Sequence, residues 1–106
     1  MAFSTPSIIA LLKRYIQCLK ENNIPVQQAI LFGSYVRGNT REESDIDVAI
    51  ISTAFDGDRF SDRRLIVPFR RGIDSRIEPI PLTPKDFEVG GVFIDEIKKT
   101  GQIIPD

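Results

Sequence analysis

Two aspartates one residue apart, Asp45 and Asp47, open an apolar run and are well placed for metal chemistry. If this run is a strand, its side chains alternate between faces, so both carboxylates share one face about 6.6 Å apart along the strand. Carboxylates that share a face repel each other, and one is driven towards protonation unless a cation neutralises the pair. Mg²⁺ suits such a pair, because it commonly takes one or two carboxylates together with the phosphate oxygens of a substrate.

A second motif, Gly33-Ser34, directly follows the apolar run at 26–32. Glycine at a strand end lets a ligand approach the backbone, and the N–H groups that open a helical turn attract anions, with a serine hydroxyl as a further donor. Either motif alone is usually a turn or a cap. Because both stand at strand boundaries of one short segment, we predict a site for a metal-bound triphosphate.

The composition excludes several other kinds of site. The chain has no histidine and one cysteine, Cys18, so histidine triads, internal disulfides and cysteine-built zinc sites are excluded. The formal charge of −1 argues against direct nucleic-acid binding. The longest unbroken apolar run, 8–12, is too short to span a membrane, and a lone cysteine suits the reducing cytoplasm. Any catalysis must therefore rest on carboxylates, hydroxyls, Lys or Arg.

Helical and strand patterns alternate along the chain and would position these motifs. Helices are predicted at about 5–22, 59–69 and 92–99, with short helical turns at 34–37 and 84–87. Strands are predicted at 26–32, 45–52 and 76–82, with a short edge strand at 102–104. The pattern indicates a single domain over residues 1–106 with an α/β (α+β) fold, a small mixed β-sheet flanked by helices.

Two details of this pattern are specific enough to test. The segment 59–69 is expected to bury four apolar side chains: Phe60, Leu65, Ile66 and Phe69. Pro79 and Pro81 have no N–H to donate, so strand 76–82 is expected to be unpaired, or sparsely paired, along at least one side.

Gly33-Ser34, followed after ten residues by Asp45-x-Asp47, resembles the signature of the minimal nucleotidyltransferases of the DNA polymerase beta-like superfamily. The pair at 37–38 and the serine at 44 also match, and the order of elements fits most of the remaining chain. The resemblance implies a nucleotidyltransferase fold with ATP as substrate and with Mg²⁺ bound by the two aspartates. It also implies that phosphates lie at Gly33 and Ser34.

Arg37, at the end of the same turn, is a further candidate for binding phosphate. The resemblance implies a third carboxylate on a neighbouring strand, and the matching position is Glu78, where the family more usually has aspartate. Asp74 is the alternative. Glu78 is expected to complete the metal site or to help deprotonate a hydroxyl, which attacks the α-phosphorus in line and expels pyrophosphate.

The chain shows no further segment for recognising an acceptor, so we expect another chain to supply it. A minimal nucleotidyltransferase chain whose acceptor is another protein resembles the antitoxins of HEPN–MNT toxin–antitoxin pairs. This resemblance implies transfer of AMP from ATP to a HEPN toxin, within a homo- or hetero-oligomer. Two alternatives remain open. One is transfer to a small-molecule hydroxyl, as in aminoglycoside nucleotidyltransferases, and the other is a non-catalytic module that neutralises its partner by contact alone.

Overall fold

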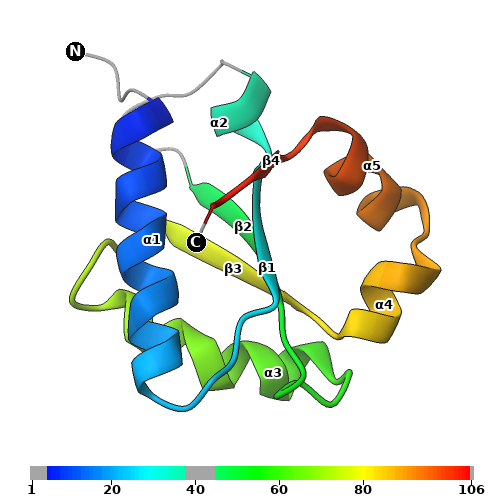
Figure 1. The fold of residues 1–106 in the computed structure, drawn as a ribbon, viewed down its shortest axis with the longest axis horizontal. Helices are drawn as coiled ribbons and strands as arrows, with labels where there is room; N and C mark the ends of the chain where they lie inside the picture. The colour runs from blue at the N-terminus through cyan, green and yellow to red at the C-terminus, as the bar shows by residue number, and fades with distance from the viewer. Residues whose placement is uncertain (1–4, 38–44, 106) are drawn as a thin grey trace.

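A four-stranded mixed sheet with the strand order β3-β2-β1-β4 forms the centre of the computed structural model (Figure 1). The strands are β1 (Gln28–Phe32), β2 (Ile46–Ile51), β3 (Ile77–Leu82) and β4 (Gln102–Ile103). β1 runs antiparallel to both β2 and β4, whereas β2 and β3 are parallel. The structure describes the backbone of residues 5–37 and 45–105, and the side chains of 7–36 and 45–105.

Helices cover both faces of this sheet, as the mixed α/β prediction requires. They are α1 (Thr5–Glu21), α2 (Ser34–Arg37), α3 (Arg59–Ile66), the 3₁₀ turn η1 (Val67–Arg70), α4 (Pro84–Val89) and α5 (Val92–Thr100). α1 lies on one side of the sheet, and α4 and α5 lie on the other (Figure 1). None of the described helices is long and apolar enough to cross a membrane.

The larger part of the core lies between α1 and the sheet. α1 buries a stripe at helical spacing, made of Ile8, Leu12, Tyr15, Ile16 and Leu19. This stripe belongs to the same apolar cluster as Leu31 of β1 and Val48 of β2. The Tyr15 hydroxyl donates a hydrogen bond to the carbonyl of Ile66 at 2.7 Å, so its one polar group is satisfied inside the core. Burial raises the pKa of Tyr15 well above its ordinary value.

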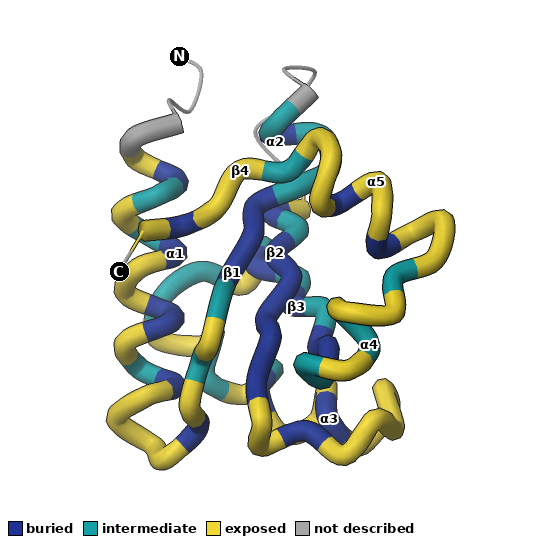
Figure 2. The backbone as a smooth tube through the Cα atoms, turned by 45° about the vertical axis from the view of Figure 1, so that its right-hand side comes forward, coloured by how far each residue is buried: buried dark blue, intermediate teal, exposed yellow. Residues whose placement is uncertain are grey.

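A smaller core fills the space between the sheet and α5. Ile94 and Ile97 of α5 belong to a buried cluster with Ile30 of β1 and Ala49 of β2. β2 is therefore buried on both faces, as its continuous apolar run predicts, and Figure 2 shows its tube as dark blue along most of its length. The two cores together fix β2, the strand that carries Asp47, in the middle of the molecule.

The expectation that α3 buries Phe60 and Leu65 is wrong. Phe60 is 72% exposed and Leu65 is 43% exposed, whereas Ile66 is buried and Phe69 packs against the core. Asp62 sets the rotation of this helix, because its carboxylate turns inward and accepts hydrogen bonds from the backbone N–H groups of residues 56 and 57 at 3.1 and 3.0 Å. Since residues follow at about 100° around a helix, Phe60 lies nearly opposite Asp62.

The expectation for the proline-containing strand is confirmed. β3 lies at one edge of the sheet and pairs only with β2 within the described part of the chain. An edge strand needs N–H donors along one side alone. The missing N–H groups of Pro79 and Pro81 therefore do not interrupt the hydrogen bonding between central strands. The parallel pairing sets Glu78 beside Asp47, which bears directly on the predicted site.

Candidate active site

Gly33 and Asp47 lie against each other where β1 ends. Phe32, the last residue of β1, pairs with Asp47 of β2, so Gly33 stands next to the aspartate. Gly33 has a φ of +80°, and a Cβ added to it would overlap Oδ2 of Asp47. The carboxylate thus occupies the space that any other residue at position 33 would fill. The structure brings these two predicted site residues together.

Ser34 opens α2 directly after this glycine. The turn is tight, since the N–H of Val36 donates to the carbonyl of Gly33 at 3.1 Å. Tyr35 points into the core and is 8% exposed, which leaves half-buried Ser34 at the strand end. Arg37 is the last residue of α2, but its side chain lies outside the described residues, as do residues 38–44 with the matching positions 38 and 44.

Asp45 is exposed and stands immediately before β2. The next residue, Ile46, is completely buried against the α1 face, and its N–H donates to the carbonyl of Arg76 at 2.8 Å. If the extended alternation of β2 continues back by one residue, Asp45 shares the face of Asp47. The structure thus places Asp47 on β2 and Asp45 directly before the first residue of that strand.

Glu78 is directly beside Asp47 in the parallel register of β2 and β3, so the two residues share a face of the sheet. Its carboxylate is already paired with cations. Arg63 donates from Nε and Nη2 to Oε2 at 3.0 and 2.8 Å, and Arg70 Nη1 lies 3.6 Å from Oε1. Across the described residues, no three His, Cys, Asp or Glu side chains cluster closely enough to bind a metal ion. Glu78 is thus adjacent to Asp47 in the sheet but held by arginines from α3 and η1.

Asp74, the alternative third carboxylate, is fully engaged in another contact. Arg76 donates to it from Nη2 at 2.6 Å, from Nε at 2.9 Å and from its backbone N–H at 2.8 Å. These bonds hold the pKa of Asp74 below its usual value of 3.8. Arg76 Nη1 also donates to the hydroxyl of Tyr35 at 3.2 Å, which links this ion pair to α2. Asp74 therefore supports the Gly33-Ser34 turn through Arg76.

We expect the Asp74–Arg76 pair to make stability depend on acid pH. Because the folded pKa is depressed, the stabilisation is present above the ordinary pKa and is lost as pH falls through the lower folded value. Between about pH 5 and pH 2, the melting temperature of the wild type should fall more steeply than that of Asp74→Asn. The variant should also be less stable at pH 7. If the melting temperatures of the two proteins, measured by circular dichroism, fall equally with pH, the ion pair does not have this role.

A cavity opens beside the Gly33–Asp47 contact, and sequence reasoning did not identify it. Its volume is about 310 Å³, and it is lined by Phe32, Gly33, Asp47, Phe93, Glu96, Ile97 and Thr100. α5 supplies the wall opposite the sheet. In the sequence, Phe93 and Glu96 read only as parts of an amphipathic helix, because nothing local shows that α5 packs beside Gly33.

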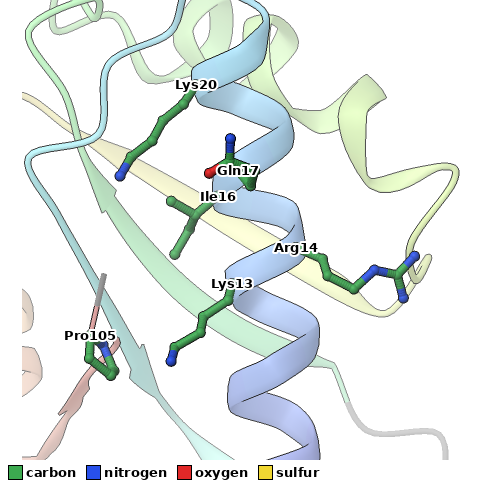
Figure 3. Close-up of a pocket in the computed structure, with 6 residues that line it drawn as sticks. All are labelled: Lys13, Arg14, Ile16, Gln17, Lys20 and Pro105. Atoms are coloured by element: carbon green, nitrogen blue, oxygen red, sulfur yellow. The ribbon is translucent and has the colours of Figure 1, made fainter.

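A separate hollow of about 350 Å³ lies between α1 and the C-terminal segment (Figure 3). It is lined by Lys13, Arg14, Ile16, Gln17, Lys20 and Pro105. None of the predicted site residues contributes to it. The hollow beside Asp47, although slightly smaller, is the one next to the predicted chemistry.

Comparison with known proteins identifies one family over nearly the whole chain. The family described as "Nucleotidyltransferase domain" matches residues 12–104. No curated protein matches. A solved structure from Sulfolobus solfataricus, provisionally called a nucleotidyltransferase, is 18% identical with a TM-score of 0.65, over 90% of this chain and 77% of that one.

Two further solved structures come from toxin–antitoxin pairs. One, with AMP-PNP, is 24% identical with a TM-score of 0.63, over 88% of this chain and 71% of that chain. The other, a mutant of the pair MntA–HpeT, is 21% identical with a TM-score of 0.60, over 88% and 70% of the two chains. At these identities the likeness shows that the fold is shared.

Proposed function

Because the chain belongs to the nucleotidyltransferase domain family, we propose that it transfers a nucleoside monophosphate, AMP from ATP, to a hydroxyl group on a partner protein. The observation that carries this proposal is the contact between Gly33 and the carboxylate of Asp47. It joins a backbone suited to phosphate and a carboxylate suited to a metal ion in one place. A triphosphate that spans them has its α-phosphorus beside Asp47.

The side chains around this contact fit Mg²⁺ rather than a softer metal. Asp45 and Asp47 offer only carboxylate oxygens from one strand face, and the chain has no histidine to add a nitrogen ligand. Mg²⁺ bound by this pair would offset the negative charge of the triphosphate and the charge that develops at the α-phosphorus. In this proposal the Gly33-Ser34 turn, with Arg37, binds the β- and γ-phosphates.

Glu78 is proposed as the group that receives the acceptor proton. The hydroxyl oxygen forms a bond to the α-phosphorus, the bond from that phosphorus to the bridging oxygen breaks, and pyrophosphate leaves. The side chains of Arg63 and Glu78 are 45% and 28% exposed, and ion pairs exposed to this degree contribute about 0–1 kcal/mol. Releasing Glu78 from Arg63 is therefore a small cost beside the barrier that catalysis lowers.

Two observations favour a protein acceptor, with this chain as the antitoxin of a HEPN-type toxin. The toxin–antitoxin structures share its fold, and one of them is described with AMP-PNP. Apolar side chains are also exposed around the turn between α4 and α5, where Val89 is 73% and Val92 is 93% exposed. Exposed apolar side chains that gather in one place are typical of protein contacts. The cytoplasm, which supplies ATP, is the compartment that we propose.

The test combines the purified protein with Mg²⁺, ATP labelled at the α-phosphate and the protein encoded by the adjacent reading frame. Label should appear on that protein, and the double variant Asp45→Asn/Asp47→Asn should transfer none. Glu88→Gln, which changes an exposed carboxylate on α4, serves as the matched control and should transfer normally. In a parallel reaction with an aminoglycoside in place of that protein, label on the aminoglycoside would favour a small-molecule acceptor.

A non-catalytic binding module is the second candidate, and the pairing of Glu78 with Arg63 and Arg70 favours it. A permanently paired Glu78 would leave the metal site with two carboxylates alone. In that case no nucleotide should label the partner, yet a stable complex should form and survive the double aspartate substitution. Size-exclusion chromatography of the mixture distinguishes this outcome from catalysis.

A further inference from the structure

We propose that the cavity between the sheet and α5 binds the nucleobase of the triphosphate, and that Phe93 and Glu96 select a base with an exocyclic amino group. The inference rests on the proposed function, because it assumes that a triphosphate lies at Gly33 and Asp47. It adds a specificity site on α5 to the carboxylates and the phosphate-binding turn.

The position and size of the cavity support a base as its occupant. Gly33 and Asp47 form one wall, so the cavity begins where the phosphates and the α-phosphorus are proposed to lie. Its volume of about 310 Å³ is at the lower end of the range for small-ligand sites. A nucleobase with part of its ribose fits that space, whereas a folded segment of a partner protein does not.

Phe93 supplies an aromatic surface at this cavity. Its ring packs edge-to-face on Phe32, with centroids 5.7 Å apart and an interplanar angle of 82°, so Phe32 holds it in place through one contact. Phe93 nevertheless remains 47% exposed, which leaves ring surface for a ligand. Aromatic side chains stack on any base, since every base has a π-face. Phe93 therefore explains affinity for a base without choosing among bases.

Glu96 is the residue that would distinguish one base from another. An ionised carboxylate only accepts hydrogen bonds, and the Thr100 hydroxyl is committed as a donor to the carbonyl of Glu96 at 2.8 Å. Within residues 7–36 and 45–105, no lysine or arginine forms an ion pair with Glu96. The α5 wall thus presents acceptors, which match the amino group of adenine, guanine or cytosine. The negative charge of the Glu96 carboxylate also disfavours phosphate in the cavity. The base is therefore placed towards α5, and the phosphates towards Ser34.

The experiment compares three ligands in the presence of Mg²⁺ by isothermal titration calorimetry: a non-hydrolysable ATP analogue, the matching analogue of purine riboside triphosphate, which lacks the amino group, and inorganic tripolyphosphate. Phe93→Ala should raise the Kd of the ATP analogue about tenfold, the loss expected for one stacking contact. Glu96→Ala should raise it by a similar factor and should abolish the preference for the amino-bearing base. Neither variant should weaken the binding of tripolyphosphate.

Matched controls come from α5 itself and from the neighbouring helix α4. Val92→Ala changes a more exposed apolar side chain on α5, and Glu88→Ala removes a carboxylate from α4; neither residue lines the cavity, so neither should change any of the three Kd values. Phe93→Leu keeps apolar bulk against Phe32 and separates loss of stacking from loss of packing. Unchanged binding of tripolyphosphate by each variant also shows that the site is folded.

Two results would overturn the inference and leave the proposed function intact. In one, Phe93→Ala and Glu96→Ala bind the ATP analogue as the wild type does while transfer of label continues. In the other, both variants weaken the ATP analogue and tripolyphosphate equally, which means that α5 acts on the phosphates. If the wild type binds none of the three ligands, the proposed function fails and the inference fails with it.

Discussion

Asp47→Asn should lower the rate of nucleotidyl transfer by about a thousandfold or more, because bound metal contributes several kcal/mol of charge stabilisation and each 1.4 kcal/mol corresponds to tenfold. Asparagine has nearly the size of aspartate, so the close contact with Gly33 is kept while the charge is lost. The chain should therefore remain folded. The measurement is the initial rate of label transfer at saturating ATP, with the melting temperature measured on the same preparation.

Glu78→Gln gives the comparison that defines the role of each carboxylate. Since Arg63 already binds Glu78, we expect loss of the Glu78 carboxylate to lower the rate less than loss of the Asp47 carboxylate does. The expected decrease is about a hundredfold, the lower end of the range for a positioned proton acceptor. ATP binding should be retained.

An Asp47→Asn protein that transfers label at more than a tenth of the wild-type rate would show that Asp47 does not bind the catalytic metal.

Gly33→Ala is expected to reduce both stability and ATP binding. The backbone strain of alanine at a φ of +80° costs about 1–2 kcal/mol. In addition, the new methyl group would overlap Oδ2 of Asp47, so that the carboxylate or the β1 end must move. We expect a Kd for Mg-ATP at least about tenfold higher, since a loss of 1.4 kcal/mol or more of binding energy has that effect. Titration calorimetry and thermal unfolding measure the two effects separately.

Gly57→Ala is the matched control for this substitution. Gly57 also has a positive φ, +101°, but no atom lies within 4 Å of the position that its Cβ would take. It should therefore lose stability through backbone strain alone and bind ATP normally. Equal losses of ATP binding in the two variants would mean that general destabilisation, rather than the contact with Asp47, explains the effect of Gly33→Ala.

Much of the fold follows from local patterns. The strand and helix spans agree with the structure to within a few residues, and β2 is buried on both faces as its apolar run predicts. Periodicity places elements because burial depends on side-chain direction, which repeats with the backbone. The rotation of α3 was not predictable in this way, since it depends on Asp62 accepting hydrogen bonds from the loop at 56–57. An inward-facing aspartate runs against the usual burial preference of its residue type.

The sequence by itself determined the reactive half of the candidate site. Gly33, Ser34, Asp45 and Asp47 lie in one short segment, and strand alternation with the chemistry of glycine and carboxylate is enough to relate them. Only the tertiary structure decided what surrounds them. The pairing of Glu78 with Arg63, and the approach of Phe93 and Glu96 to Asp47, join elements far apart in the chain. Such contacts depend on how whole helices pack, and no local spacing of residues encodes that.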